Sequence, residues 1–162
     1  MTTHKLTQPA LFRTAQKRDS LRLVSLLLVV AGVIIAGYLS YTGTIGKSPI
    51  CAEGVQWIDC GAVQNSVYSK LAGIPVAYLG LGMYLLLGAI LLLEDRLALL
   101  RDYGLILVFG LTLFGFIYSM YLVYVQAAIL QAFCEWCLTH EAVMTVLFVV
   151  STVRLVRSLR TN

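Results

Sequence analysis

Four apolar stretches, each long enough to cross a lipid bilayer as a helix, constrain this chain more than any other feature of its sequence. They cover residues 21–41, 76–93, 103–125 and, if the last begins near Cys134, 134–153. A bilayer core requires about 20 helical residues, within a range of about 17–25. A mean hydropathy of +0.85 and a charged fraction of only 12% exclude an ordinary soluble domain. We therefore predict an all-α integral membrane protein, a bundle of four transmembrane helices.

The sequence between these stretches indicates a single domain. No linker, low-complexity tract or repeat of useful period divides the chain. We expect an N-terminal tail over residues 1–20, one membrane domain over 21–157 and a short C-terminal tail over 158–162. The first stretch follows basic residues, as in a secretory signal, but it exceeds the apolar run of about 7–15 residues usual for one. We expect an anchor that is not cleaved.

The distribution of Lys and Arg predicts the orientation. Lys47 and Lys70 fall on one side of the predicted membrane. The other side carries Lys5, Arg13, Lys17, Arg18, Arg22, Arg96, Arg101, Arg154, Arg157 and Arg160. Because basic residues in short loops and near span ends are retained in the cytoplasm, both termini are expected there. All four cysteines then lie on the outer face, which is the oxidising side.

The cysteines form two pairs. Cys51 and Cys60 lie in the first outer loop, and Cys134 and Cys137 lie where the third helix passes to the fourth. Two pairs in one compartment provide what a thiol–disulfide relay needs, because a thiolate attacks a disulfide through a mixed disulfide. Residues three apart share a helix face, and a helix N-terminus favours a thiolate, although Glu135 opposes that effect.

Two simpler interpretations of the cysteines were considered. Cys51 and Cys60 are nine residues apart, wider than the usual spacing of zinc ligands, so we expect no metal site. In the second interpretation, the cysteines form only structural disulfides in a non-enzymatic membrane scaffold or transport subunit, and this class of function stays open. Transport usually requires ionisable groups within the membrane, whereas Glu94, Asp95 and Glu141 lie near predicted helix ends.

The segment after Cys60 predicts a short amphipathic helix on the outer face. Val63, Val67 and Leu71 repeat every four residues, and Gly73 with Pro75 supplies a stop signal. Such a helix would cap the bundle and close a pocket open to lipid. A simple re-entrant connector fits the pattern equally well.

An ordered set of motifs carries a family resemblance. The set is Cys51, Cys60-x-x-Val63-x-x-Ser66-x-Tyr68-Ser69, Gly73-Ile74-Pro75 and Cys134-x-x-Cys137 at the start of the last helix. From Leu21 to Arg157, the chain resembles the vitamin K epoxide reductase family. The resemblance implies a four-helix bundle around a quinone, either ubiquinone or menaquinone.

The resemblance also implies roles for individual residues. Cys137 would adjoin the quinone, Cys134 would exchange with the loop, Cys60 would attack Cys134, and Cys51 would meet the external partner. Ser66 and His140 are also candidate quinone contacts. Ser66 is carried over from the resemblance, and His140 lies one turn beyond Cys137. His140 could supply a positive charge or relay a proton, although an interfacial polar residue needs no such role.

The implied activity is that of a thiol:quinone oxidoreductase in a bacterial plasma membrane. It would reoxidise a periplasmic thioredoxin-fold protein of the DsbA type and so support disulfide-bond formation.

Animal members carry an Asn near the start of the second helix and a Tyr four residues past the last cysteine. Here residues 75–77 contain no Asn, and the second position is Glu141. A quinone or quinone-epoxide reductase driven by partner thiols is the alternative. Many bacterial members continue into a fused thioredoxin-like domain. Here only a short tail, ending at Asn162, follows the fourth span, so we expect the partner to be a separate protein.

Overall fold

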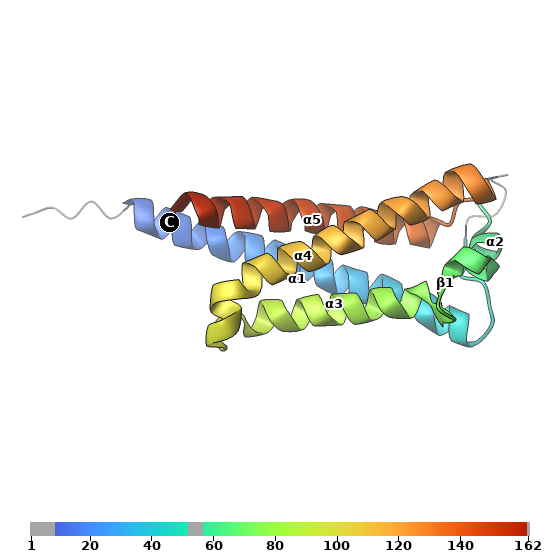
Figure 1. The fold of residues 1–162 in the computed structure, drawn as a ribbon, viewed down its shortest axis with the longest axis horizontal. Helices are drawn as coiled ribbons and strands as arrows, with labels where there is room; N and C mark the ends of the chain where they lie inside the picture. The colour runs from blue at the N-terminus through green and yellow to red at the C-terminus, as the bar shows by residue number, and fades with distance from the viewer. Residues whose placement is uncertain (1–8, 52–56, 162) are drawn as a thin grey trace, which may run out of the picture.

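The computed structural model describes residues 9–51 and 57–161, and within them four long helices form a bundle (Figure 1). These are α1 (Pro9–Thr44), α3 (Val76–Leu93), α4 (Ala98–Tyr124) and α5 (Glu135–Thr161). An all-helical bundle follows from the apolar sequence, because a helix satisfies its own backbone hydrogen bonds in lipid. The predicted fold class is confirmed.

Within the described residues, four segments of these helices are long and apolar enough to cross a membrane. They are Ser20–Thr44, Val76–Leu93, Tyr103–Leu130 and Glu135–Arg160. The third includes a π-helical turn, η2 (Val125–Leu130), that continues α4. The fourth begins one residue after Cys134 and is long enough to span a bilayer.

The core of the bundle contains a buried tyrosine that packs against a glycine. Tyr84 of α3 is fully buried, and a Cβ added at Gly32 of α1 would lie 2.3 Å from its ring atoms. Likewise, a Cβ at Gly115 of α4 would lie 2.8 Å from the sulfur of Met144 in α5. Small residues at such contacts let membrane helices approach closely.

An ion-pair cluster joins α1, α3 and α5 at the bundle end away from the cysteines. Glu94 forms an ion pair with Arg22, whose Nε lies 3.1 Å from Oε1, and accepts a hydrogen bond from Arg154 Nη2 at 3.0 Å. Arg22 also pairs with Asp95 and donates from Nη2 to the Leu91 carbonyl at 2.8 Å. Because it involves three helices, the cluster fixes their relative positions at this end.

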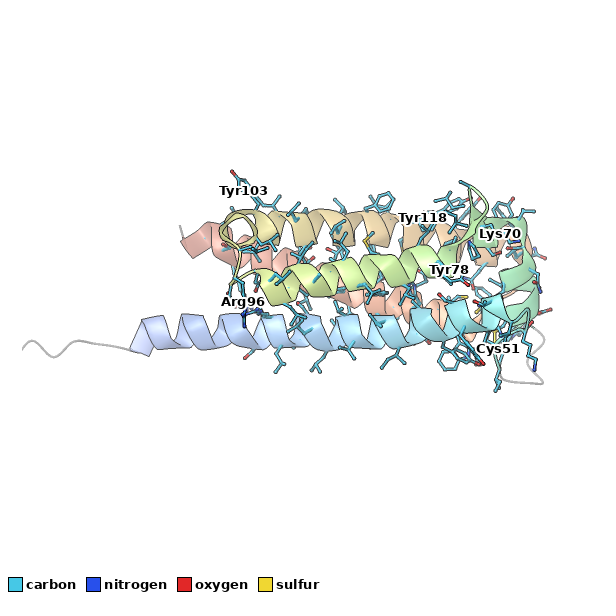
Figure 2. The ribbon with its side chains drawn as sticks, turned by 90° about the horizontal axis from the view of Figure 1, so that it is seen from below. Cys51, Lys70, Tyr78, Arg96, Tyr103 and Tyr118 are labelled. Carbon is cyan, nitrogen blue, oxygen red and sulfur yellow. A yellow bond between two sulfur atoms is a disulfide. The ribbon has the colours of Figure 1, made fainter. Side chains whose placement is uncertain are left out.

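Short elements cover the opposite end of the bundle (Figure 1). They are α2 (Cys60–Asn65), the 3₁₀ turn η1 (Val67–Ser69) and the antiparallel strands β1 (Lys70–Leu71) and β2 (Ile74–Pro75). Figure 2 shows Cys51, Lys70 and Tyr78 at this end, and Arg96 and Tyr103 at the other.

A short helix is thus present after Asp59, but the prediction that Val63, Val67 and Leu71 share one helical face is wrong. The helix ends at Asn65 because Ser66 is extended, with φ −65° and ψ 157°. Leu71 lies in β1 instead. Ala72 and Gly73 both have positive φ, 51° and 85°, and such a pair makes the tight turn of a two-residue hairpin.

Candidate redox site

The cysteines form one disulfide and one pair of free thiols. Cys51 is joined to Cys60, with their Cα atoms 6.4 Å apart. Cys134 and Cys137 are free. Cys60 and Cys134 are buried, whereas Cys51 is only partly buried. Cys51 is therefore the more accessible sulfur of the disulfide.

A short parallel bridge holds the loop beside the second pair. The Asp59 N–H donates to the Phe133 carbonyl at 3.0 Å, and the Phe133 N–H donates to the Trp57 carbonyl at 2.8 Å. Cys60 directly follows Asp59, and Cys134 directly follows Phe133. The two hydrogen bonds therefore place the two buried cysteines on adjoining pieces of backbone.

Asp59 also determines where α2 begins. Its carboxylate accepts a hydrogen bond from the Ala62 N–H at 2.8 Å. This satisfies one of the N–H groups that a helix leaves unpaired at its start. Cys60 therefore occupies the first turn of a capped helix, and the cap and the bridge act through the same residue.

A buried glutamine orients the start of the second pair. Gln126, within η2, accepts from the Cys134 N–H through its side-chain oxygen at 3.0 Å. Its backbone carbonyl accepts from the Ala132 N–H at 3.2 Å, and Gln131 has the left-handed φ of 51° that reverses the chain. Pi-helical turns are frequently found at functional sites. In the sequence, Gln126 could have been singled out as a polar residue within a largely apolar segment.

Trp136, between the two free cysteines, contacts the loop directly. Its indole N–H donates to the Ile50 carbonyl at 2.8 Å, and its ring centroid lies 4.7 Å from that of Tyr38. The Tyr38 hydroxyl accepts from the Ile50 N–H at 3.1 Å. The structure thus places this tryptophan against the residue before Cys51.

The electrostatic environment of Cys134 favours its thiolate. The largest effect that lowers the pKa of Cys134 is a hydrogen bond from the Cys137 side chain. The backbone N–H groups of Cys137, 3.3 Å from the sulfur, and of Trp136 act in the same direction. Burial and the Glu135 carboxylate oppose the shift, but the net pKa is lowered.

A cavity of about 230 Å³ adjoins the second pair. It lies between the last turns of α1, the α2 to β2 segment, the start of α3, η2 and the first turns of α5. Cys137 lines it. Its polar wall includes Ser40, Ser66, Tyr78, Gln126, His140 and Glu141. A mostly apolar cavity with a few convergent polar groups is the usual form of a small-molecule site.

Both residues that the sequence singled out as quinone contacts line this cavity. The Ser66 hydroxyl donates to the Val63 carbonyl at 2.8 Å, so its lone pairs rather than its hydrogen face a ligand. The His140 ring packs edge-on against Tyr84, with 5.3 Å between centroids. A Cβ at Gly80 would lie 3.1 Å from His140 Nε2. The absence of a side chain there gives the imidazole room beside α3.

Two lining oxygens have no hydrogen-bond partner among the described residues: Ser40 Oγ and Glu141 Oε2. Ser40 is 5% exposed and Glu141 is 4% exposed. Sequence reasoning gave neither residue a functional role. Buried polar atoms are normally paired, so these two oxygens are available to a polar group of a bound molecule.

A helical membrane protein with a disulfide beside two free thiols, one of them on the wall of a cavity, has the architecture of a membrane thiol–disulfide oxidoreductase. The family model described as "Vitamin K epoxide reductase family" matches residues 23–152. The chain belongs to this family, which confirms the resemblance carried by its motifs. It is accordingly a membrane oxidoreductase of a family linked to thiols and quinones.

Proposed function

We propose that this protein is a thiol:quinone oxidoreductase that reoxidises a thioredoxin-fold protein of the DsbA type in the bacterial periplasm. Electrons pass from the partner to Cys51–Cys60, then to Cys134–Cys137 and then to ubiquinone or menaquinone. The observation that carries the proposal is the bridge between Asp59 and Phe133. It joins the loop disulfide to a pair whose second member, Cys137, lines the cavity.

The exposure of the loop supports entry of electrons at Cys51. Beside the disulfide, Ile50 is 84% exposed and Trp57 is 66% exposed. These apolar side chains offer a docking surface to a thioredoxin-fold protein. The partner's thiolate attacks Cys51 Sγ, the Cys51–Cys60 bond breaks, and Cys60 leaves as a thiolate.

Electrons then cross to the second pair by exchange. The Cys60 thiolate attacks Cys134 of the oxidised Cys134–Cys137 pair, and Cys137 leaves. The partner's second thiolate attacks its own mixed disulfide and releases Cys51, which attacks Cys60 and displaces Cys134. The partner departs oxidised, the loop disulfide is restored and the second pair is left as two thiols. This is the redox state in which the four cysteines are described.

The cavity is the proposed site of the last transfer. A bound quinone accepts two electrons and two protons. Cys134 and Cys137 lose two electrons as their disulfide closes, and Cys137 lines the cavity where the acceptor is proposed to bind. Ser66 and His140 contact the ring from the cavity wall, Ser66 without donating a hydrogen bond to it, because its hydroxyl already donates to the Val63 carbonyl.

The proposed topology places the cysteine end of the bundle in the periplasm. The other end carries Arg22, Arg96 and Arg154, and basic residues favour the cytoplasmic side. Both termini are then cytoplasmic. The disulfide lies in the compartment where disulfides persist.

Quinone reduction by purified protein in detergent tests the proposal. A reduced DsbA-type protein is the donor, and Cys51, Cys60, Cys134 and Cys137 are each changed to Ala. All four variants are expected to fail with the protein donor. A small dithiol, which bypasses the loop, should still drive the Cys51 and Cys60 variants. If none of the cysteines is required, the redox proposal is wrong. Faster turnover of a quinone epoxide than of the quinone would favour the epoxide reductase instead.

A further inference from the structure

Gln126 is a buried polar residue to which the relay described above gives no task. Thr112, Ser119 and Gln126 follow one another at seven-residue spacing, about two helical turns, and all three are buried. Thr112 contacts Ser151 of α5, with 2.7 Å between their hydroxyl oxygens. Gln126, which is 3% exposed, therefore extends the buried polar stripe of α4 to the point where α5 begins.

The short segment just before α5 is paired along both of its edges. On one edge, Phe133 bonds to the loop through the parallel bridge. On the other edge, the Ala132 N–H donates to the Gln126 backbone carbonyl at 3.2 Å, and the Cys134 N–H donates to the Gln126 side-chain oxygen at 3.0 Å. Gln126 thus pairs with the residues on both sides of Phe133, as a neighbouring strand does in a ladder.

The side-chain oxygen of Gln126 fixes the position of the Cys134 backbone. Cys134 is fully buried, so its N–H has no water to donate to if that oxygen is removed. A buried backbone donor without a partner is unfavourable, and the segment would have to shift to give it another acceptor. Such a shift would also move Cys134 relative to the bridge that joins the segment to the loop.

The position of the Cys134 backbone decides which groups its sulfur meets. Cys134 directly precedes Glu135, the first residue of α5, and its sulfur accepts from the Cys137 N–H at 3.3 Å, as a side chain at a helix N-cap does. The hydrogen bond from the Cys137 side chain, followed by backbone N–H groups, lowers the pKa of Cys134. A dithiol whose reduced form is stabilised in this way gives a more oxidising disulfide.

We propose that Gln126 is the positioning residue of the second cysteine pair: its amide oxygen holds Cys134 beside the loop and at the start of α5, which makes the Cys134–Cys137 disulfide a stronger oxidant of the loop. This inference rests on the proposed function, because it concerns the exchange between the two pairs. Over that exchange, the partner's two thiols lose two electrons and two protons, an S–S bond closes in the partner, and the Cys134–Cys137 bond opens to two thiols. Gln126 itself exchanges neither electrons nor protons.

The first test measures the reduction potential of the second pair in the full chain in detergent. Variants that also carry Cys51→Ala and Cys60→Ala are titrated with thiol–disulfide buffers, so that only Cys134 and Cys137 respond. Gln126→Met keeps the length of the side chain but lacks the amide oxygen. Its potential should be more negative by about 20 mV, which corresponds to the roughly fivefold change expected for loss of one hydrogen bond. Gln131→Met is the matched control, because Gln131 is exposed in the same segment, and it should leave the potential unchanged.

Two single-turnover measurements separate the exchange between the pairs from the quinone step. A reduced DsbA-type donor mixed with fully oxidised protein should reduce the second pair about fivefold more slowly in Gln126→Met than in the wild type. Pre-reduced protein mixed with decylubiquinone should reduce the quinone no more slowly. Because Gln126 also lines the cavity, the affinity of the oxidised protein for decylubiquinone is measured as well and should be unchanged. Weaker quinone binding with normal transfer through the loop would overturn the inference.

Hydrogen exchange of the Cys134 amide, followed by NMR with labelled cysteine, provides a readout independent of turnover. The proton should be protected in the wild type, lose protection in Gln126→Met and regain it in Gln126→Glu, whose carboxyl oxygen has the same reach. If Gln126→Met does not fold, Gln126→Asn, whose amide is one methylene shorter, replaces it in every measurement. An unprotected amide in the wild type, or an unchanged potential and loop rate in the folded variant, overturns the inference alone. Failure of the wild type to reduce quinone overturns the proposed function as well.

Discussion

The indole N–H of Trp136 donates a 2.8 Å hydrogen bond to the carbonyl of Ile50, 86 residues earlier in the chain. This contact joins the segment between the free cysteines to the residue before Cys51. The Trp136 ring packs at a tilt against Tyr38, whose hydroxyl accepts from the Ile50 N–H. With the bridge at Phe133, it holds both ends of the disulfide loop against the second cysteine pair.

Trp136→Phe should slow electron transfer through the loop. The substitution removes the hydrogen bond to Ile50 while retaining an aromatic ring beside Tyr38, so the loop loses one of its contacts with the second pair. Loss of one net hydrogen bond, worth about 1 kcal/mol, predicts a rate with the protein donor about fivefold lower. Turnover with a small dithiol, which bypasses the loop, is the control and should be unaffected. Equal losses with both donors would contradict a role in holding the loop.

Changes around Cys134 should move its thiolate titration in opposite directions. Because the hydrogen bond from Cys137 is the largest cause of its lowered pKa, Cys137→Ala should raise that pKa. The Glu135 carboxylate raises the pKa of Cys134, so Glu135→Gln should lower it. Carbon NMR of labelled cysteine Cβ atoms, recorded against pH in the reduced protein, measures both. Shifts in the same direction would contradict this electrostatic account.

The lowered pKa also predicts how the stability of the reduced protein depends on pH. A thiol whose pKa is lower in the folded than in the unfolded state contributes stability that is fully present above the unfolded value, about 8.5. The contribution is lost as the pH falls through the folded pKa of Cys134. The free energy of unfolding of the reduced wild type, minus that of Cys134→Ser, should therefore rise with pH across this window. A difference that falls with pH would contradict a lowered pKa.

Gly32→Ala should destabilise the bundle. The new Cβ would lie 2.3 Å from the ring of the fully buried Tyr84, and overpacking of a core costs about 1–3 kcal/mol. Gly37→Ala, in the same helix, is the matched control, because nothing lies within 4 Å of its added Cβ. Unfolding in mixed detergent micelles measures both. Equal stability of the two variants would show that α1 and α3 separate at no cost.

Glu94→Gln should destabilise the protein without impairing the relay. It removes the carboxylate that pairs with Arg22 and Arg154, and breaking a buried ion pair costs about 3–5 kcal/mol. Since the Glu94 side chain is 14% exposed, the lower part of that range is expected. Asp95→Asn is the control: its side chain is 70% exposed, and an exposed pair contributes about 1 kcal/mol or less. Quinone reduction by the folded Glu94 variant should match the wild type.

The sequence alone determined the class of this protein. Lipid allows few backbone structures, and apolar runs of this length form helices in it, so the four-helix bundle could be predicted from composition and spacing. The ordered cysteine motifs indicated the family. Ser66 and His140 line the cavity, and their positions relative to Cys60 and Cys137 are local properties of the sequence; their role as quinone contacts stays a prediction.

Contacts between distant segments were decided only by the tertiary structure. The bridge to Phe133, the Trp136 contact with Ile50 and the glutamine behind Cys134 join residues whose sequence patterns carry no sign of one another. The break in the helix after Asn65 arose because a hairpin turn competed with the helical period. Glu141 reads in sequence as a charge near a helix end. Only the packing of η2, α1 and the α2 to β2 segment around the first turns of α5 encloses it beside Cys137.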